Sequence, residues 1–217
     1  MIVRLRAHNA FLEMLGEVRK VDAIVLCEGA REALAVEKVG TRLGAVGEKK
    51  NVAIVDSEGL DALRTGMLPA ILAFIVKKVV RKAKAVGVLI DMEELNYESR
   101  LRGLLDSVRA REYEVGEPER VCRATWRTVV STRQREVPVV VSISGLPEFP
   151  LERHTIEDHL LQLKILEGRE SRDVVNRIKR AEEAVSREDA RLLDEARESN
   201  LGKAFEHVLC LLKSVDP

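Results

Sequence analysis

The sequence predicts an α/β fold: a mostly parallel sheet with helices on both faces, followed by a helical C-terminal extension. Three short apolar runs are rich in Val and Ile, which is typical of strands buried on both faces: 22–27, 51–56 and 85–91. Stretches with apolar residues at helical spacing follow them: 30–44, 59–83 and 93–112. Such alternation of strand and helix is typical of parallel sheets whose crossover helices cover both faces.

Glycine and proline mark the boundaries of these elements. Gly29 lets the chain turn sharply after the first strand, and Gly40 and Gly44 are candidate ends of the helix that follows. Pro69 begins a new helical segment inside 59–83, because proline is well tolerated in the first turn of a helix.

Two further strands are predicted after Pro118, around the polar turn TRQRE at 132–136. The second of them, VPVVVSI at 137–143, is nearly all apolar, which predicts a central position in the sheet. Pro138 stands near its start, where a strand tolerates proline.

The chain becomes charged and helical from about residue 150. Its predicted helical segments open on the capping candidates Thr155, Ser171 and Ser186. We therefore divide the chain into an α/β domain, 1–165, and a helical extension, 166–217, that packs on it. The extension either caps the sheet or mediates a homodimer, and the sequence leaves both open.

Composition narrows the classes of function. Lys and Arg (36) balance Asp and Glu (36), so net charge indicates neither a nucleic acid nor a membrane surface. Aromatic residues make up 3%, too few for a platform that stacks single-stranded bases. The longest apolar run, 67–76, is about half the length of a membrane span, and it predicts a buried helix.

The sequence favours a cytoplasmic protein. Arg4 and Arg6 interrupt the N-terminal apolar run, so we expect no signal peptide. Cys27, Cys122 and Cys210 are scattered without metal-binding spacing, which predicts reduced thiols. Rare Gln beside abundant Glu and Arg is typical of thermophiles.

Carboxylates follow two of the predicted strands at the point where each strand ends. Glu28 comes directly after the first strand, Asp91 ends the third, and Glu93 follows two residues later. In a parallel sheet these ends meet at the edge where ligands bind. Asp91 and Glu93 face the same side if the chain is extended, and Glu32 lies one helical turn after Glu28. Four carboxylates so close together need a compensating cation, and oxygen ligands favour Mg²⁺ or Mn²⁺.

These motifs resemble the TOPRIM domain, which topoisomerases, bacterial primases, small ribosomal RNA maturases and OLD-family (overcoming lysogenisation defect) nucleases share. The resemblance is carried by IVLCEGAREAL at 24–34 and VGVLIDMEE at 86–94, in that order. HTIEDHLL at 154–161 resembles the downstream acidic element of OLD-like proteins. The resemblance covers residues 20–165 and implies a Rossmann-like, TOPRIM-like sheet.

The resemblance also implies a function, which is metal-dependent phosphodiester cleavage in DNA or RNA. Glu28 matches the TOPRIM glutamate, a general acid or base or a metal ligand, and Asp91 and Glu93 match the metal-binding pair. That pair is Asp-Met-Glu here, whereas the family has Asp-x-Asp. The further acidic ligands implied for a second metal ion are Glu32 and one of Glu157 and Asp158.

Each motif also has a structural interpretation. Glu28 suits the positive N-terminal end of a helix, and Asp91 is an ordinary N-cap candidate. Glu157 and Asp158 are common residue types at a helix start. His154, beside them, belongs to a class of isolated histidines that are more often structural than metal ligands.

Two function classes therefore remain open. The first is a Mg²⁺- or Mn²⁺-dependent nuclease or related phosphotransfer enzyme, and the second is a non-catalytic TOPRIM-like module that binds nucleic acid or a partner protein. OLD nucleases usually carry an ATPase domain, but GTRLGAVGEKK at 40–50 does not fit a P-loop, so an ATPase is absent or acts in trans. A topoisomerase, a primase and a response-regulator receiver are disfavoured, since their further motifs are missing.

Overall fold

The structure, a computed structural model, describes residues 2–6, 21–47, 50–56, 83–131, 135–186 and 188–215. Of the predicted helix at 59–83, residues 59–82, which include its apolar run, lie outside these residues.

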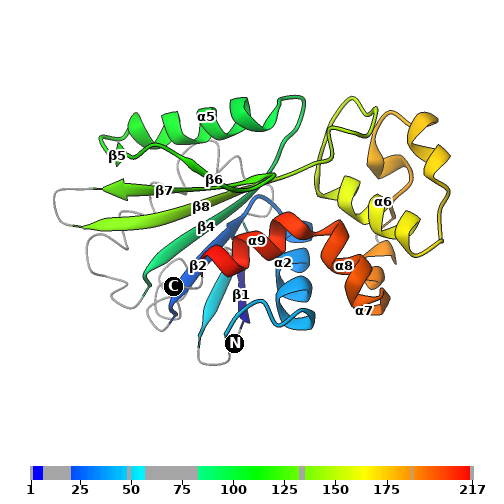
Figure 1. Cartoon of the computed structure of the whole chain (residues 1–217), viewed down its shortest axis with the longest axis horizontal. Helices are drawn as coiled ribbons and strands as arrows, with labels where there is room; N and C mark the ends of the chain where they lie inside the picture. The colour runs from blue at the N-terminus through cyan, green and yellow to red at the C-terminus, as the bar shows by residue number, and fades with distance from the viewer. Residues whose placement is uncertain are drawn as a thin grey trace.

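The described strands form one mixed sheet in the order β1-β3-β2-β4-β8-β7-β5, and β6 also pairs with β7 (Figure 1). The first five strands in this order are parallel, whereas β7, β5 and β6 are added antiparallel. The strands are β1 (Ile2–Arg6), β2 (Ala23–Cys27), β3 (Val52–Asp56), β4 (Ala85–Asp91), β5 (Glu114–Val115), β6 (Glu119–Cys122), β7 (Thr125–Ser131) and β8 (Glu136–Ser144). The predicted α/β class with a mostly parallel sheet is confirmed.

The apolar strand β8 lies between β4 and β7, so its predicted central position is also confirmed. The strands β1, β5 and β6 were not predicted. β5 has two residues, and β6 (ERVC) carries charge at its first two positions, so neither shows the apolar run by which the other strands are recognised.

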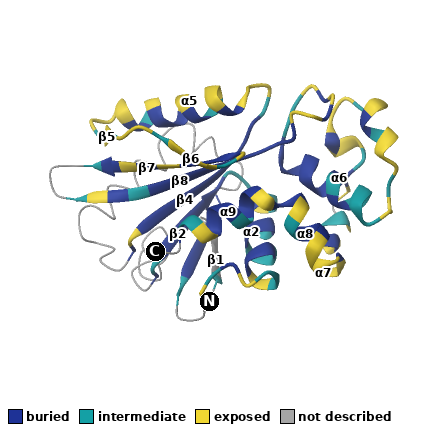
Figure 2. Ribbon diagram, viewed as in Figure 1, coloured by how far each residue is buried: buried dark blue, intermediate teal, exposed yellow. Residues whose placement is uncertain are grey.

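Helices pack on both faces of the sheet and make two hydrophobic cores (Figure 1). On one face lies α5 (Tyr97–Arg109), and on the other lie α2 (Ala30–Arg42) and α9 (Glu206–Val215). The alternation of side chains along β2 shows the division: Ile24 and Leu26 pack in the α5 core, and Val25 and Cys27 in the α2 and α9 core. The strands β2 and β4 are buried at every position, and β8 is buried except near its start (Figure 2).

The C-terminal helix α9 lies unusually close to β4. A Cβ atom at Gly87 would be 3.1 Å from the Val215 side chain and 3.2 Å from that of Leu211, so glycine makes room for the helix. Leu211, Leu212 and Val215 are fully buried against the sheet. The last helix is therefore a layer of the main core.

The segment between residues 167 and 205 is less helical than the sequence predicts. It contains three 3₁₀ turns, η1 (Arg172–Asn176), η2 (Ala181–Glu183) and η3 (Glu188–Arg191), and the short helices α7 (Leu192–Glu195) and α8 (Glu198–Ala204). Ser171 caps η1 as expected, through a bond from the Asp173 N–H. Few apolar side chains in 171–186 are buried, so no continuous stripe supports longer helices.

The prediction of three reduced thiols is wrong. Cys122 on β6 and Cys210 on α9 form a disulfide across 88 residues, and Cys27 is a buried free thiol. Distant sequence positions are brought together by the sheet order, which cysteine spacing does not reveal. Among the described helices none has the length and apolar content needed to cross a bilayer.

Candidate functional site

The carboxyl ends of β2 and β4 place Glu28 and Asp91 side by side. β2 and β4 are paired in parallel with Cys27 opposite Leu89, so both strands end at the same edge. The Glu28 backbone N–H donates to the Leu89 carbonyl at 3.1 Å, and the Glu28 Oε2 accepts the Asp91 backbone N–H at 3.1 Å. The predicted meeting of these two strand ends is therefore found.

The start of α6 (Ile156–Leu166) closes the site from a third element. The Ile156 backbone N–H donates to Asp91 Oδ1 at 2.9 Å, so the carboxylate of Asp91 caps this helix. Thr155, the predicted cap, occupies the N-cap position, but its hydroxyl makes no bond with described groups. The aspartate at the strand end thus takes the role expected of the threonine.

Four carboxylates converge here, and we call them the acidic cluster: Glu28, Glu32, Asp91 and Glu157. Glu32, in the first turn of α2, is 5% exposed, and Asp91 is 8% exposed. Burial raises the pKa of Glu32 to about 7, and repulsion from Glu157 and Glu28 adds to this. Burial also raises the pKa of Asp91, and the charges of Glu32, Glu157 and Glu28 reinforce the shift.

Gly29 lets Glu32 reach the cluster. A Cβ atom at position 29 would lie 2.8 Å from Glu32 Oε2, so the carboxylate folds back over a residue without a side chain. Gly29 adopts an extended conformation (φ −144°) as the N-cap of α2, so the small size of glycine matters here and not its freedom at positive φ.

Two arginines partly neutralise the acidic cluster. Arg100 on α5 donates to Glu28 Oε2 at 2.9 Å and, through Nε, to the Asp91 carbonyl at 2.7 Å. Arg31 forms an ion pair with Glu157. In the described part of the chain no Lys or Arg forms a salt bridge with Glu32 or Asp91, so negative charge exceeds positive. Neither arginine was singled out in the sequence, because nothing in the spacing of residues 31 and 157, or 28 and 100, links them.

Glu93 is paired with Arg153 and does not continue the strand beyond Asp91. The strand ends at Asp91, and Glu93 has φ +62°, so the expectation that both side chains extend to the same side is wrong. Both Glu93 oxygens accept from Arg153, with 2.7 Å between Oε1 and Nη2. The backbone turn is fixed by a bridge to His154, which the sequence gives no sign of.

Asp158 binds groups outside the acidic cluster, although its neighbour Glu157 belongs to the cluster. Successive residues of a helix point about 100° apart. Asp158 Oδ2 accepts the Leu146 backbone N–H at 2.9 Å and lies 2.7 Å from His154 Nδ1. Of the two residues left open by the sequence, Glu157 is the one that contributes to the charge around Asp91.

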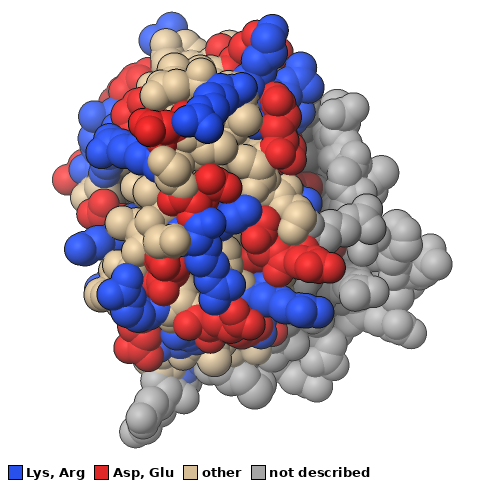
Figure 3. All heavy atoms as spheres, turned by 90° about the vertical axis from the view of Figure 1, so that its right-hand side faces the viewer, with Lys and Arg blue, Asp and Glu red and all other residues tan. Residues whose placement is uncertain are grey.

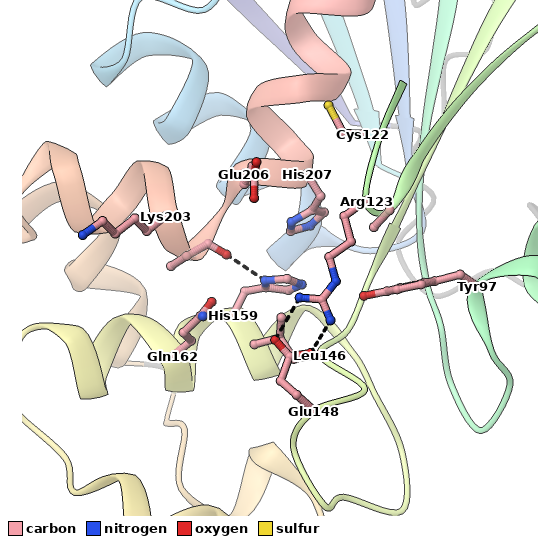
Figure 4. A pocket seen from close by; sticks show the side chains of 12 residues that line it. Tyr97, Cys122, Arg123, Leu146, Glu148, His159, Gln162, Lys203, Glu206 and His207 are labelled. Carbon is pink, nitrogen blue, oxygen red and sulfur yellow. Dashed lines mark hydrogen bonds and ion pairs between the residues drawn. The ribbon is translucent and has the colours of Figure 1, made fainter. Parts of the chain in front are cut away.

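A separate polar pocket of about 120 Å³ lies between α6, α9 and the β6–β7 turn (Figure 4). His159 fills its base: Nε2 accepts the Gly145 N–H at 2.9 Å, and Nδ1 donates to the Ala204 carbonyl at 2.7 Å. His207 stacks on it with 4.0 Å between ring centroids. Burial lowers the pKa of His159 to about 4, so the ring is neutral at pH 7. Both His159 nitrogens are occupied, which leaves neither for a metal ion or a proton transfer.

The acidic cluster fits a divalent cation by its chemistry but is not preassembled around one. In the described residues no group of three or more His, Cys, Asp or Glu side chains is arranged to hold a metal ion. Hard carboxylate oxygens are nevertheless the ligands that Mg²⁺ and Mn²⁺ prefer. A bound cation would offset the repulsion that, together with burial, raises the Glu32 and Asp91 pKa values.

The surface around the C-terminal helices has no single sign of charge. Figure 3 shows Lys and Arg side chains interspersed with Asp and Glu over this face. Such a mixed surface does not create the long-range field that attracts nucleic acid without sequence preference. Comparisons of the chain with protein-family models, with curated proteins and with solved structures gave no match.

Proposed function

We propose that the acidic cluster binds Mg²⁺ or Mn²⁺ and that the protein is a metal-dependent phosphodiesterase of TOPRIM type, acting on DNA or RNA. The observation that supports this most is the convergence of four carboxylates from β2, α2, β4 and α6, two of them with raised pKa values. Strong pKa perturbation by burial and like charge is typical of functional sites. A cluster kept for stability alone would be paired more completely.

Each residue of the cluster has a role in this proposal. Glu32, Asp91 and Glu157 are the ligands, because they approach one another from three elements. When bound, the cation supplies charge that polarises the phosphate and favours ionisation of a water molecule. Glu28 accepts the proton of the attacking water, since its carboxylate lies at the strand end beside Asp91. Arg100 holds Glu28 in place until substrate binds.

The test is calorimetric titration of Mn²⁺ together with cleavage of single-stranded DNA and RNA. Asp91→Asn keeps the shape and the bond from Ile156 but removes one charge, so we expect Mn²⁺ affinity and cleavage to fall at least about 100-fold. Glu28→Gln should abolish cleavage while Mn²⁺ still binds.

Asp106→Asn is the matched control, because Asp106 is exposed on α5 and pairs only with Arg109 among the residues that the structure describes. It should behave as the unaltered protein. A folded protein that shows neither a Mn²⁺ titration nor Mn²⁺-dependent cleavage would overturn the proposed function.

The second candidate function is a non-catalytic TOPRIM-like module that binds nucleic acid or a partner protein. The observation that favours it is that two residues matched to the TOPRIM motifs are already paired with arginines: Glu93 gives both oxygens to Arg153, and Glu28 is paired with Arg100. Mn²⁺ binding without cleavage of any DNA or RNA substrate would select this second function.

A further inference from the structure

We infer that His154 is a catalytic residue of the proposed reaction. Its imidazole gives a proton to the oxygen that leaves phosphorus, and Asp158 positions the ring. This inference rests on the proposed function and extends it to a residue outside the acidic cluster.

The pair of His154 and Asp158 has the geometry of an oriented imidazole. His154 Nδ1 lies 2.7 Å from Oδ2 of Asp158, which follows four residues later in the chain. Asp158 is fully buried, and its Oδ2 also accepts the Leu146 N–H, so the carboxylate is fixed. A carboxylate only accepts hydrogen bonds, so Nδ1 must carry the proton and Nε2 is the nitrogen left for a substrate.

The backbone holds His154 next to the acidic cluster. His154 and Glu93 exchange two backbone hydrogen bonds, of 2.8 and 2.9 Å, directly after the strand that ends at Asp91. Two residues beyond His154, the Ile156 N–H binds the Asp91 carboxylate. Gly145 makes this packing possible, since a Cβ there would lie 2.8 Å from the His154 Cβ. The chain from 154 to 156 therefore runs across the end of β4.

His154 lines a cavity of about 390 Å³, a size that suits a nucleoside. Its side chain is 12% exposed, and no described group binds Nε2. Apolar side chains of Leu95, Pro147 and Leu151 line the same cavity and offer contact to a sugar or base. Glu94, Glu98 and Glu152 also line the cavity, and their negative charge disfavours a phosphate there. The phosphate therefore lies at the cation, and the leaving nucleoside occupies the cavity.

The step balances with these groups. The oxygen of the attacking water forms a bond to phosphorus, and its proton passes to Glu28. The bond from phosphorus to the leaving oxygen breaks, and its electron pair stays on that oxygen. The protonated His154 ring gives its Nε2 proton to the leaving oxygen, which departs as an alcohol. The proton on Glu28 then returns through solvent to the ring.

The contrast with His159 explains why His154 is the histidine chosen. The two residues lie five positions apart: His154 precedes α6, and His159 lies in the first turns of that helix. Both ring nitrogens of His159 form hydrogen bonds with backbone groups, and the residue is buried. His154 has one ring nitrogen in a hydrogen bond and borders a cavity. Proton transfer requires the free nitrogen that only His154 has of these two.

The experiment compares two substrates whose leaving groups differ in basicity, with Mn²⁺ and the whole chain. The leaving group of a DNA oligonucleotide is a basic alkoxide, which needs a proton. The leaving group of bis(p-nitrophenyl) phosphate is a stable phenolate, which does not. For His154→Ala we expect cleavage of the oligonucleotide to fall about 100-fold or more, with cleavage of the phenyl ester changed less than about threefold. Added imidazole should restore part of the oligonucleotide cleavage.

Asp158→Asn is the second variant, because Asn keeps the acceptor for the Leu146 N–H and tests the positioning role. In this variant cleavage of the oligonucleotide should again fall more than cleavage of the phenyl ester, but by a smaller factor than in His154→Ala. Glu195→Gln is the control, because Glu195 is exposed, pairs with Arg169 and does not line this cavity. Calorimetry should give unaltered Mn²⁺ affinity for all three variants.

Each outcome decides the inference. Equal loss on both substrates, no loss on either, or weakened Mn²⁺ binding in His154→Ala would overturn the role of His154 and leave the proposed function standing. If the unaltered protein cleaves neither substrate, the proposed function fails and the inference fails with it.

Discussion

Two buried polar regions of this protein are built in opposite ways. The histidine layer, formed by Thr125, Ser142, Ser144, His159 and His207, carries no net charge, and its groups bind one another or the backbone. The acidic cluster has four carboxylates and two arginines, and the pKa values of Glu32 and Asp91 are raised. A satisfied neutral network stabilises a fold, whereas excess buried charge costs stability and indicates a ligand. The histidine layer therefore has the features of a structural network, and the acidic cluster is the region on which the proposed function rests.

The largest expected effect concerns the disulfide that ties α9, the helix of the histidine layer, to β6. Reduction of Cys122–Cys210 opens a loop of 88 residues, so we expect the free energy of unfolding to fall by about 4–5 kcal/mol. Mn²⁺ affinity of the folded protein should not change, because other bonds hold the acidic cluster. Urea unfolding and calorimetry, each with and without dithiothreitol, measure the two quantities.

The double variant Cys122→Ser/Cys210→Ser is the control for this experiment. Its stability should match that of the reduced protein and should not respond to dithiothreitol. If reduction left the stability of the unaltered protein unchanged, α9 would be held by packing alone. If reduction abolished Mn²⁺ binding, the two regions would not be independent.

The comparison also shows what the sequence could predict. Glu28 and Asp91 were correctly brought together, because each directly follows a buried apolar run and parallel strands end at one edge. The extended conformation predicted for Glu93 is not found, since the residue has a positive φ and bridges to His154, 61 positions later.

Long-range partners explain the other differences. Arg100 and Arg31 reach the cluster from helices whose orientation is set by tertiary packing, and the histidine layer forms only when α9 returns to the sheet. The disulfide has the same origin. Local periodicity carries information about strands and helices, but not about which distant polar side chains they bring into contact.

The next expected effect is the opposite response of the two regions to pH. Glu32 has a pKa of about 7 in the folded protein and an ordinary value of 4.5. Between these values the folded chain binds more protons than the unfolded chain, so its stability falls as pH rises. For His159 the pKa is about 4 against an ordinary 6.5, so the folded chain binds fewer protons and stability rises over that window.

The slopes of these two groups oppose each other between pH 4.5 and 6.5, and each group accounts for about 3 kcal/mol at full titration. Glu32→Gln removes the Glu32 slope, so we expect the stability of this variant, relative to that of the unaltered protein, to rise between pH 4.5 and 7. Above pH 7 the variant should be the more stable protein. Urea unfolding at several pH values measures this, and a variant whose pH profile matches the unaltered one would refute the charge imbalance.

The smallest expected effect comes from Arg31→Met. This variant tests, inside the acidic cluster, whether excess negative charge both lowers stability and favours cation binding. Arg31 is partly exposed, with a side-chain exposure of 35%, so losing its pair with Glu157 should cost the metal-free protein less than about 1 kcal/mol. Arg31 also competes with a cation for Glu157, so its removal should strengthen Mn²⁺ binding, by about fivefold if the pair is worth 1 kcal/mol.

Lys38→Met is the matched control, because Lys38 lies on the same helix and pairs with the exposed Asp194 away from the cluster. It should alter neither stability nor Mn²⁺ affinity measurably. Lower stability and tighter Mn²⁺ binding in Arg31→Met would have one physical cause. Without Arg31 the carboxylates of the acidic cluster repel one another more strongly, and the same negative charge attracts the ion. If both quantities fell together, Arg31 would be a structural support of the site, and excess charge would not explain its affinity for cations.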